Sequence, residues 1–327
     1  MKKKRLLSVV VLSLIVCLCM GCGKNTSGLK RVRLQEVAHS IFYAPMYVAL
    51  EEGDFKEEGL DVELSNGNGA DKVMTAMIAG EADIGFMGPE AGIYVFNEGN
   101  SDYAINFAQL TQRAGNFLVG RSDNPNFKWS DLKGKTVIGG RAGGMPQMVF
   151  EYILKMNGLN PAKDLTIIQN IDFGVTAEAF AGGTGEYTVE FEPHATGIEK
   201  EGAGHVIASL GVDSGYVPYT CFSALGSYIN EHPDIIQSFT NGIQKGLDYV
   251  NSHSSEEIAK IIQPQFAETD FDTLKTIVER YHSQDTWKTD TIFTEEAFEL
   301  LQNILEEAGV LEKRVDYDVL VTTRFSK

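Results

Sequence analysis

Strand-like and helix-like segments alternate from residue 31 to residue 225, and this alternation limits the fold more than any other feature of the chain. The run RVRLQEV (31–37) precedes the helix-like APMYVALEEG (44–53), and LDVEL (60–64) precedes GADKVMTAMIAG (69–80). Strands that alternate with helices of about ten residues are typical of parallel α/β construction. We therefore predict an α/β fold.

The alternation restarts at DLKGKTVIGG (131–140), so the chain reads as two α/β halves, followed by an almost purely helical tail. Extended segments near 110–118 and 215–226 would join the halves. In open α/β sheets ligands collect at the carboxyl ends of the strands, so loops from both halves would line one cleft. The predicted lobes are residues 31–112 with 226–327, and residues 113–225.

The first residues have the pattern of an export signal. Four basic residues at 2–5 precede an apolar run at 6–20. Cys19 and Cys22 form a CxxC, but neither a hydrated metal site nor a folded redox loop fits inside a hydrophobic leader. A small residue directly before Cys22 matches a bacterial lipoprotein signal. We predict a signal peptide at 1–21, lipidation of Cys22 and a flexible tether at 22–30.

The charge of the chain excludes some partners. Removing the leader takes four of the 28 basic residues and none of the 45 acidic ones, so 24 basic residues remain and the net charge becomes −21. This balance argues against nucleic acid and against electrostatic docking on anionic lipid. Cys221 is then the only cysteine after Cys22, so the folded domain is expected to have no internal disulfide.

Polar and aromatic residues gather in the loops that follow the predicted strands. Each has a simpler structural alternative: aromatic rings can be core, and a carboxylate at a helix start can merely complement the helix dipole. Together, aromatic faces, carboxylates and backbone donors describe a pocket for a small planar or polar molecule. The predicted ligand-binding residues are His39, Phe42, Tyr43, Asn68, Gly88, Glu90, Thr111, Arg141, Gly143, Gly144, Glu190, Glu192, Tyr216 and Tyr219.

The glycine-rich segment VIGGRAGGMP (137–146) raises the question of phosphate binding. Met145 and Pro146 stand where a P-loop requires Lys and Ser or Thr, so that motif is excluded. Pro146 suits the first turn of a helix, whose N–H groups could donate to a ligand. Gly143 and Gly144 would then let the backbone approach the ligand; alternatively, they only permit a tight turn.

Motifs for catalysis are missing from the sequence, which has no GxSxG, HExxH or DxDxDG. A carboxylate pair such as Glu90 and Glu192 could support acid–base chemistry only if the fold brought the two together. We expect a protein that is not an enzyme and that has no cofactor and no metal.

Three motifs resemble a known family. YAPMYVALEEGDFKEEGLDVEL (43–64), VMTAMIAGEADIGFMG (73–88) and WSDLKGKTVIGG (129–140) are similar to segments of the solute-binding proteins of ABC importers. The most similar branch binds thiamine pyrimidine precursors, aliphatic sulfonates, taurine or nitrate. The resemblance implies a periplasmic-binding-protein fold of type II and a monomeric, extracytoplasmic protein. Such a protein closes on its solute and delivers it to a permease, and thereby indirectly to the ATPase.

The predicted carboxylates bear on the choice of ligand. A buried carboxylate beside a sulfonate or nitrate would be costly, whereas an aminopyrimidine offers N–H donors that Glu90 or Glu192 could accept and a ring that aromatic residues could stack on. Arg141 favours an anion unless it pairs with Glu192. The hypothesis is therefore a thiamine-precursor pyrimidine or a similar N-heterocycle. The alternatives are a sulfonate, taurine or nitrate binder, a lipid-anchored sensor, and an enzyme resembling the fungal pyrimidine synthases, whose cysteine-rich run this chain lacks.

Overall fold

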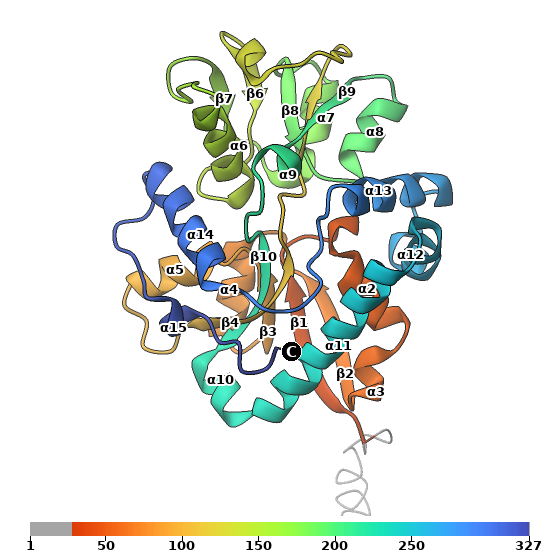
Figure 1. The fold of residues 1–327 in the computed structure, drawn as a ribbon, viewed down its shortest axis with the longest axis vertical. Helices are drawn as coiled ribbons and strands as arrows, with labels where there is room; N and C mark the ends of the chain where they lie inside the picture. Colours follow the sequence, from red (N-terminus) through yellow and green to blue (C-terminus); the bar gives the residue numbers. More distant parts are fainter. Residues whose placement is uncertain (1–27, 327) are drawn as a thin grey trace, which may run out of the picture.

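The computed structural model describes residues 28–326. The predicted signal peptide, the lipidation of Cys22 and most of the predicted tether lie outside these residues. Two lobes, each built on one five-stranded sheet, stand one above the other (Figure 1).

The first sheet has the strand order β2-β1-β3-β10-β4. Strand β1 is parallel to β2 and β3, whereas β10 runs antiparallel to β3 and β4. The strands predicted at 31–37 and 60–64 are confirmed as β1 and β2. The strands are β1 (Lys30–Glu36), β2 (Leu60–Asn66), β3 (Ile84–Met87), β4 (Ala104–Thr111) and β10 (Thr220–Leu225).

The predicted boundary at residue 225 placed β10 in the second lobe, but its pairing with β3 and β4 puts it in the first sheet. The alternation of segments does not reveal this, because β10 follows β9 in the same rhythm. The chain therefore returns to the first lobe before β10, and the two crossing segments are bonded to each other. Val217 N donates to Gln112 O at 2.9 Å, and Tyr219 N donates to Thr111 O.

Helices cover both faces of the first sheet (Figure 1). The long helix α11 packs on α2 and α3. Gly246 permits the close approach of α11 to α2, because a Cβ there would overlap the Pro45 carbonyl. The helices around this sheet are η1 (Ile41–Tyr43), α2 (Ala44–Glu51), α3 (Asp54–Glu57), α4 (Ala70–Ile78), α5 (Glu90–Asn97), α10 (Gly226–Glu231) and α11 (Pro233–Ser252).

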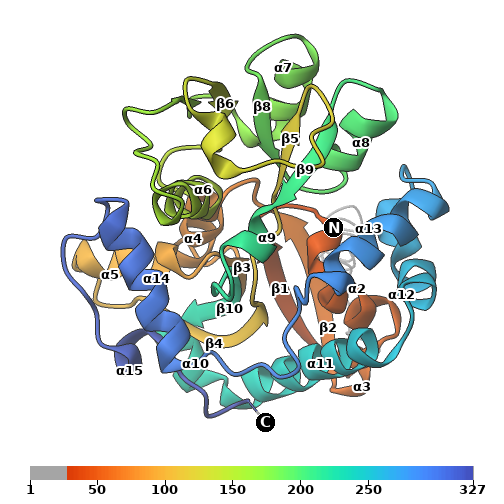
Figure 2. The same ribbon diagram turned by 45° about the horizontal axis from the view of Figure 1, so that its top comes forward.

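The second sheet has the strand order β7-β6-β8-β5-β9. Figure 2 shows α9 at the junction of the two lobes. The strands are β5 (Phe117–Gly120), β6 (Thr136–Ile138), β7 (Thr166–Ile168), β8 (Tyr187–Glu190) and β9 (His205–Ser209). The helices are η2 (Trp129–Leu132), α6 (Met145–Met156), η3 (Phe173–Val175), α7 (Thr176–Ala181), α8 (His194–Lys200) and α9 (Leu210–Asp213).

The predicted helical tail is confirmed, and side chains cap its helices. The Ser254 side chain accepts from Glu257 N at the start of α12, and Asp270 and Thr294 cap α13 and α14 in the same way. Helix α13 lies beside α8 of the second lobe, and α14 lies against α6 (Figures 1 and 2). The elements are α12 (Ser255–Ile262), η4 (Gln263–Phe266), α13 (Phe271–Ser283), α14 (Glu295–Glu307) and α15 (Tyr317–Leu320).

Candidate ligand-binding site between the lobes

An aromatic cluster fills the space where strand ends of the two lobes meet. The Phe42 ring lies 5.1 Å from Tyr43, 5.6 Å from Tyr219 and 5.3 Å from Tyr281, measured between ring centroids. Phe191, which follows β8 of the second lobe, lies 5.7 Å from Phe42. The structure thus brings together three predicted residues, Phe42, Tyr43 and Tyr219. Phe191 and Tyr281 were missed, because aromatic residues in a strand or helix also fit an ordinary core.

Glu90 is the first residue of α5, directly after β3, and only 4% of it is exposed. Its carboxylate lies over Gly88, where any side chain would overlap it. Burial raises the pKa of Glu90 to about 7, which its own backbone N–H partly opposes. Among residues 28–326, Glu90 Oε2 has no hydrogen-bond partner.

The negative charge of Glu90 affects the pKa of three tyrosines. Burial raises the phenol pKa of Tyr43, Tyr94 and Tyr219, and the negative charge of Glu90 raises each further. Cys221 pairs antiparallel with Met87, so Tyr219, two residues before Cys221, and Glu90, three residues after Met87, lie at the same end of the first sheet. Because these side chains are packed together, we infer that a ligand reaches them only when the lobes separate.

Glu190 lies inside the second lobe at the end of β8. Its carboxylate accepts hydrogen bonds from Thr176 Oγ1 at 2.9 Å and Thr188 Oγ1 at 2.5 Å. Burial raises its pKa to about 7, although both threonine hydroxyls act in the opposite direction. This carboxylate therefore has donors from its own lobe.

Glu192 has a full set of partners. Its Oε1 accepts from Arg280 of α13 at 2.5 Å and from Thr196 Oγ1 at 2.9 Å, while Oε2 accepts from Thr196 N at 2.9 Å. It thus caps the first turn of α8 and joins the lobes through Arg280, which also pairs with Glu199. These contacts leave Glu192 less available to a ligand than the sequence suggested.

Arg141 does not pair with Glu192, which was one interpretation of its charge. Its guanidinium donates to Asp71 Oδ1 of α4 at 2.8 Å, and both side chains are exposed. The pair joins the glycine-rich segment to the first lobe at the outer surface.

The predicted helix start with Pro146 in its first turn is confirmed. Gly144 is the N-cap of α6, and Gly143 adopts φ of +81°, which favours glycine. The Tyr94 hydroxyl donates to Gly143 O at 3.5 Å, so the glycine-rich turn faces α5 of the first lobe. Gly143 N donates to Gln147 Oε1 at 3.0 Å instead of being free for a ligand.

His39 lies at the end of β1, where both ring nitrogens face acceptors. Its Nδ1 lies 2.8 Å from Glu36 Oε1, and its Nε2 lies 2.9 Å from Gln265 O. The hydrogen bond to Glu36 raises the pKa of His39, and burial opposes this effect. The ring also stacks on Phe266, so His39 links β1 to η4.

The other predicted residues lie in the sheet, in a turn and near the crossings. Thr111 Oγ1 is 2.5 Å from Thr220 Oγ1 within the β4–β10 pair. Asn68 has φ of +53° in a turn. Tyr216 is exposed, lies under the Arg113 guanidinium and donates to Asp285. Of these residues, Thr111 touches the aromatic cluster through its backbone, because its carbonyl accepts from Tyr219 N at 3.3 Å.

Asn116, in the first crossing segment, was missed by the sequence analysis. It is buried, and its Oδ1 accepts the Tyr219 hydroxyl at 2.6 Å. Its Nδ2 has no partner within the described chain. No local pattern marks this residue, because one asparagine in an extended segment is typical of any loop.

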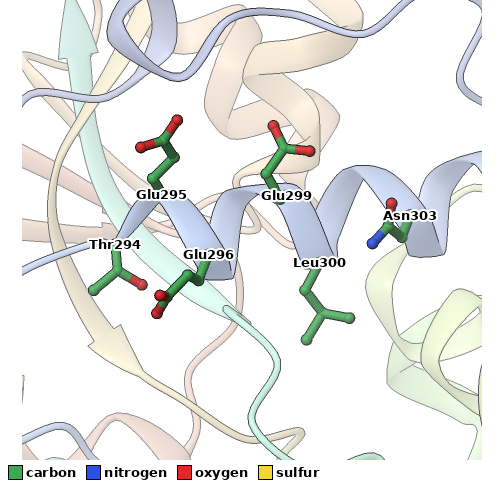
Figure 3. Close-up of a pocket in the computed structure, with 6 residues that line it drawn as sticks. All are labelled: Thr294, Glu295, Glu296, Glu299, Leu300 and Asn303. Atoms are coloured by element: carbon green, nitrogen blue, oxygen red, sulfur yellow. The ribbon is translucent and has the colours of Figure 1, made fainter.

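A hollow of about 700 Å³ lies along α14, and all of its lining residues belong to this helix or its N-cap (Figure 3). Its carboxylates face solvent, and Glu299 pairs with Arg314 at 2.5 Å. A surface with one wall cannot enclose a solute, so we do not take it as the ligand site. The lining residues are Thr294, Glu295, Glu296, Glu299, Leu300 and Asn303.

The helices and the side chains of metal-ligating types in residues 28–326 bear on membrane spanning and metal binding. None of their helices combines the length and apolar character needed to cross a bilayer. Their His, Cys, Asp and Glu side chains do not form groups of three or more that could hold a metal ion.

Two mixed sheets joined by two crossing segments define the class of two-lobed proteins with the periplasmic-binding-protein fold. The chain belongs to the NMT1/THI5-like family, whose model matches residues 41–257. It is 46% identical over 315 residues to YtlA of Bacillus subtilis (strain 168), which is named as a binding protein; the match covers 96% of this chain and 94% of YtlA.

Solved structures support the fold. The alkanesulfonate-binding protein SsuA of Xanthomonas axonopodis pv. citri, bound to MOPS, has a TM-score of 0.72 at 14% identity, covering 90% of this chain and 98% of that one. The nitrate-binding protein NrtA of Synechocystis PCC 6803 has a TM-score of 0.69 at 15% identity, covering 91% and 86%. The predicted periplasmic-binding-protein fold is thereby confirmed.

Proposed function

We propose that this chain is the lipid-anchored, extracytoplasmic solute-binding component of an ABC importer. It takes a small N-heterocycle, such as a thiamine pyrimidine precursor, between its lobes. The permease and, through it, the ATPase are its partners, and the lipid on Cys22 holds it to the membrane. Changing Cys22 to Ser should release the protein from the membrane fraction; continued membrane retention would contradict the anchor.

The observation that carries the choice of ligand is Glu90. Its carboxylate is buried at the lobe junction, and the described residues supply Oε2 with no donor. An unpaired buried carboxylate is unfavourable, and a ligand N–H that donates to it relieves this cost. A sulfonate or nitrate would require this carboxyl to be protonated, because two negative charges would otherwise be buried together, whereas an amine binds the ionised form.

The fold alone does not select the ligand, because its structural neighbours include sulfonate- and nitrate-binding proteins. The aromatic cluster supports a flat ring, since Tyr43 and Tyr219 could pack on a heteroaromatic face once the lobes open, and Tyr219 lies at the same sheet end as Glu90. The ring would thus have apolar faces and a polar edge directed at the carboxylate.

Calorimetric titration tests the proposal with four probes: 4-amino-5-hydroxymethyl-2-methylpyrimidine, taurine, an alkanesulfonate and nitrate. We expect the pyrimidine to bind and Glu90→Gln to weaken it about 10- to 100-fold, because a hydrogen bond to a charged group contributes about 1.5–3 kcal/mol. Glu98→Gln, at the exposed end of the same helix, is the matched control and should bind normally. Binding of the anions alone, or unchanged pyrimidine affinity in Glu90→Gln, would overturn the proposal.

A further inference from the structure

We propose that Asn116 is a specificity-determining residue whose Nδ2 donates to an acceptor on the ligand, such as a ring nitrogen, while Glu90 accepts from an amine on the same ligand. This inference rests on the proposed function and narrows its substrate class. The ligand is a planar molecule that carries both an amine donor and a neutral acceptor.

Asn116 is held in place by Tyr219 of the second crossing segment and by Leu210 of α9. Its side-chain Oδ1 accepts the Tyr219 hydroxyl at 2.6 Å, and its backbone O accepts from Leu210 N at 3.0 Å. Because a phenol proton needs an acceptor, this contact turns Oδ1 toward Tyr219 and leaves Nδ2 for another partner. The described residues provide none, although only 1% of Asn116 is exposed.

Tyr219 connects this donor to Glu90. The Tyr219 ring packs on Phe42 and Phe191, with centroids 5.6 and 6.1 Å away. Tyr219 lies two residues before Cys221, which pairs antiparallel with Met87, so Tyr219 and Glu90 are at the same end of the first sheet. One unpaired donor and one unpaired acceptor therefore flank the same aromatic cluster.

The two groups also come from opposite sides of the lobe junction. Glu90 starts α5 of the first lobe, and Asn116 directly precedes β5 of the second. A ligand that meets both gains contacts only when the lobes are together, which would favour the closed form. Buried side-chain amides usually find a hydrogen-bond partner, and apolar surroundings leave little room for water to serve as one.

The Asn116 amide as donor and the Glu90 carboxylate as acceptor together discriminate among small solutes. An aminopyrimidine has an amine for Glu90 and ring nitrogens that can accept from Asn116. Nitrate and sulfonates could accept from Asn116, but their negative charge opposes that of Glu90. Two ring analogues isolate the acceptor: 2-aminopyridine and 4-aminopyridine each keep the amine and lack one ring nitrogen of 4-aminopyrimidine.

The experiment titrates 4-aminopyrimidine and the two pyridines into the wild type and Asn116→Leu, with Asn116→Ala as a second variant should Leu prevent folding. In the wild type, one pyridine should bind about 10-fold more weakly than the pyrimidine, equivalent to about 1.4 kcal/mol. The Asn116 variants should lose that preference. Each ligand is compared across variants, so differences in ring basicity cancel.

Tyr219→Phe is the control for a purely structural role, because it removes the bond to Oδ1 and keeps the Asn116 donor. It should weaken all three ligands but lower the preference less than the Asn116 variants do, because the amide remains and loses only the bond that orients it. If the Asn116 variants keep the full preference for the pyrimidine, Asn116 does not recognise a ring nitrogen. In that case this inference fails and the proposed function stands. If none of these amines binds the wild type, the proposed function fails as well.

Discussion

Replacing Glu90 with Gln in the ligand-free protein should raise its stability at pH 8 and leave it unchanged at pH 4. Burial raises the pKa of Glu90 from 4.5 to about 7, so the folded chain holds this proton to a higher pH than the unfolded chain does. Glu90 therefore contributes most to folding stability below pH 4.5, and this contribution is lost as the pH rises to about 7. Glutamine stays neutral throughout, so the variant should gain about 3 kcal/mol over the wild type at pH 8.

Urea denaturation at pH 4 and pH 8, without ligand, measures this difference. Glu190 titrates over the same pH range in both proteins, so only the difference between variant and wild type reports on Glu90. Glu98→Gln should show no such pH-dependent gain. A gain of equal size at both pH values, or no gain at either, would refute the argument that Glu90 is a buried carboxylate without a donor from another residue.

The contacts between the lobes support two further predictions. Arg280→Ala leaves the buried Glu192 carboxylate without its cation and should lower the free energy of unfolding by about 3 kcal/mol; a urea denaturation change below about 1 kcal/mol would contradict this. A double variant with Asp71→Cys and Arg141→Cys can be cross-linked by a short bis-maleimide. Cross-linking without ligand should block pyrimidine binding, and cross-linking with ligand present should retain the bound ligand. Unchanged association after linking would show that the solute reaches its site without separation of the lobes.

The fold could be predicted because its pattern is local. Alternating segments such as LDVEL and GADKVMTAMIAG indicate β2 and α4 without any knowledge of their neighbours. The membership of β10 could not be predicted in this way, because it depends on pairing with β3 and β4, which are distant in sequence. Segment type follows from the period of apolar residues, whereas sheet order follows from the path of the chain between the lobes.

The sequence locates candidate site residues at strand ends. It does not show which of them have hydrogen-bond partners within the protein and which do not. His39 shows the difficulty, since its two acceptors are Glu36, three residues away, and the carbonyl of Gln265, which is 226 residues away. Asn116 shows the converse, because its significance lies in a hydrogen bond it does not make. Tertiary packing determines whether a polar group has a hydrogen-bond partner, so a local sequence pattern does not predict it.

Glu90 and Glu192 make this distinction matter for the ligand. In the sequence they look alike, since each carboxylate lies near a proline and close to a helix start after a strand. Arg280, 88 residues further along the chain, neutralises Glu192 and leaves Glu90 as the carboxylate without a cation or an N–H donor from another residue. The proposed ligand therefore needs one amine at the lobe junction instead of two. Its remaining polar edge can be an acceptor, as the unpaired amide of Asn116 requires.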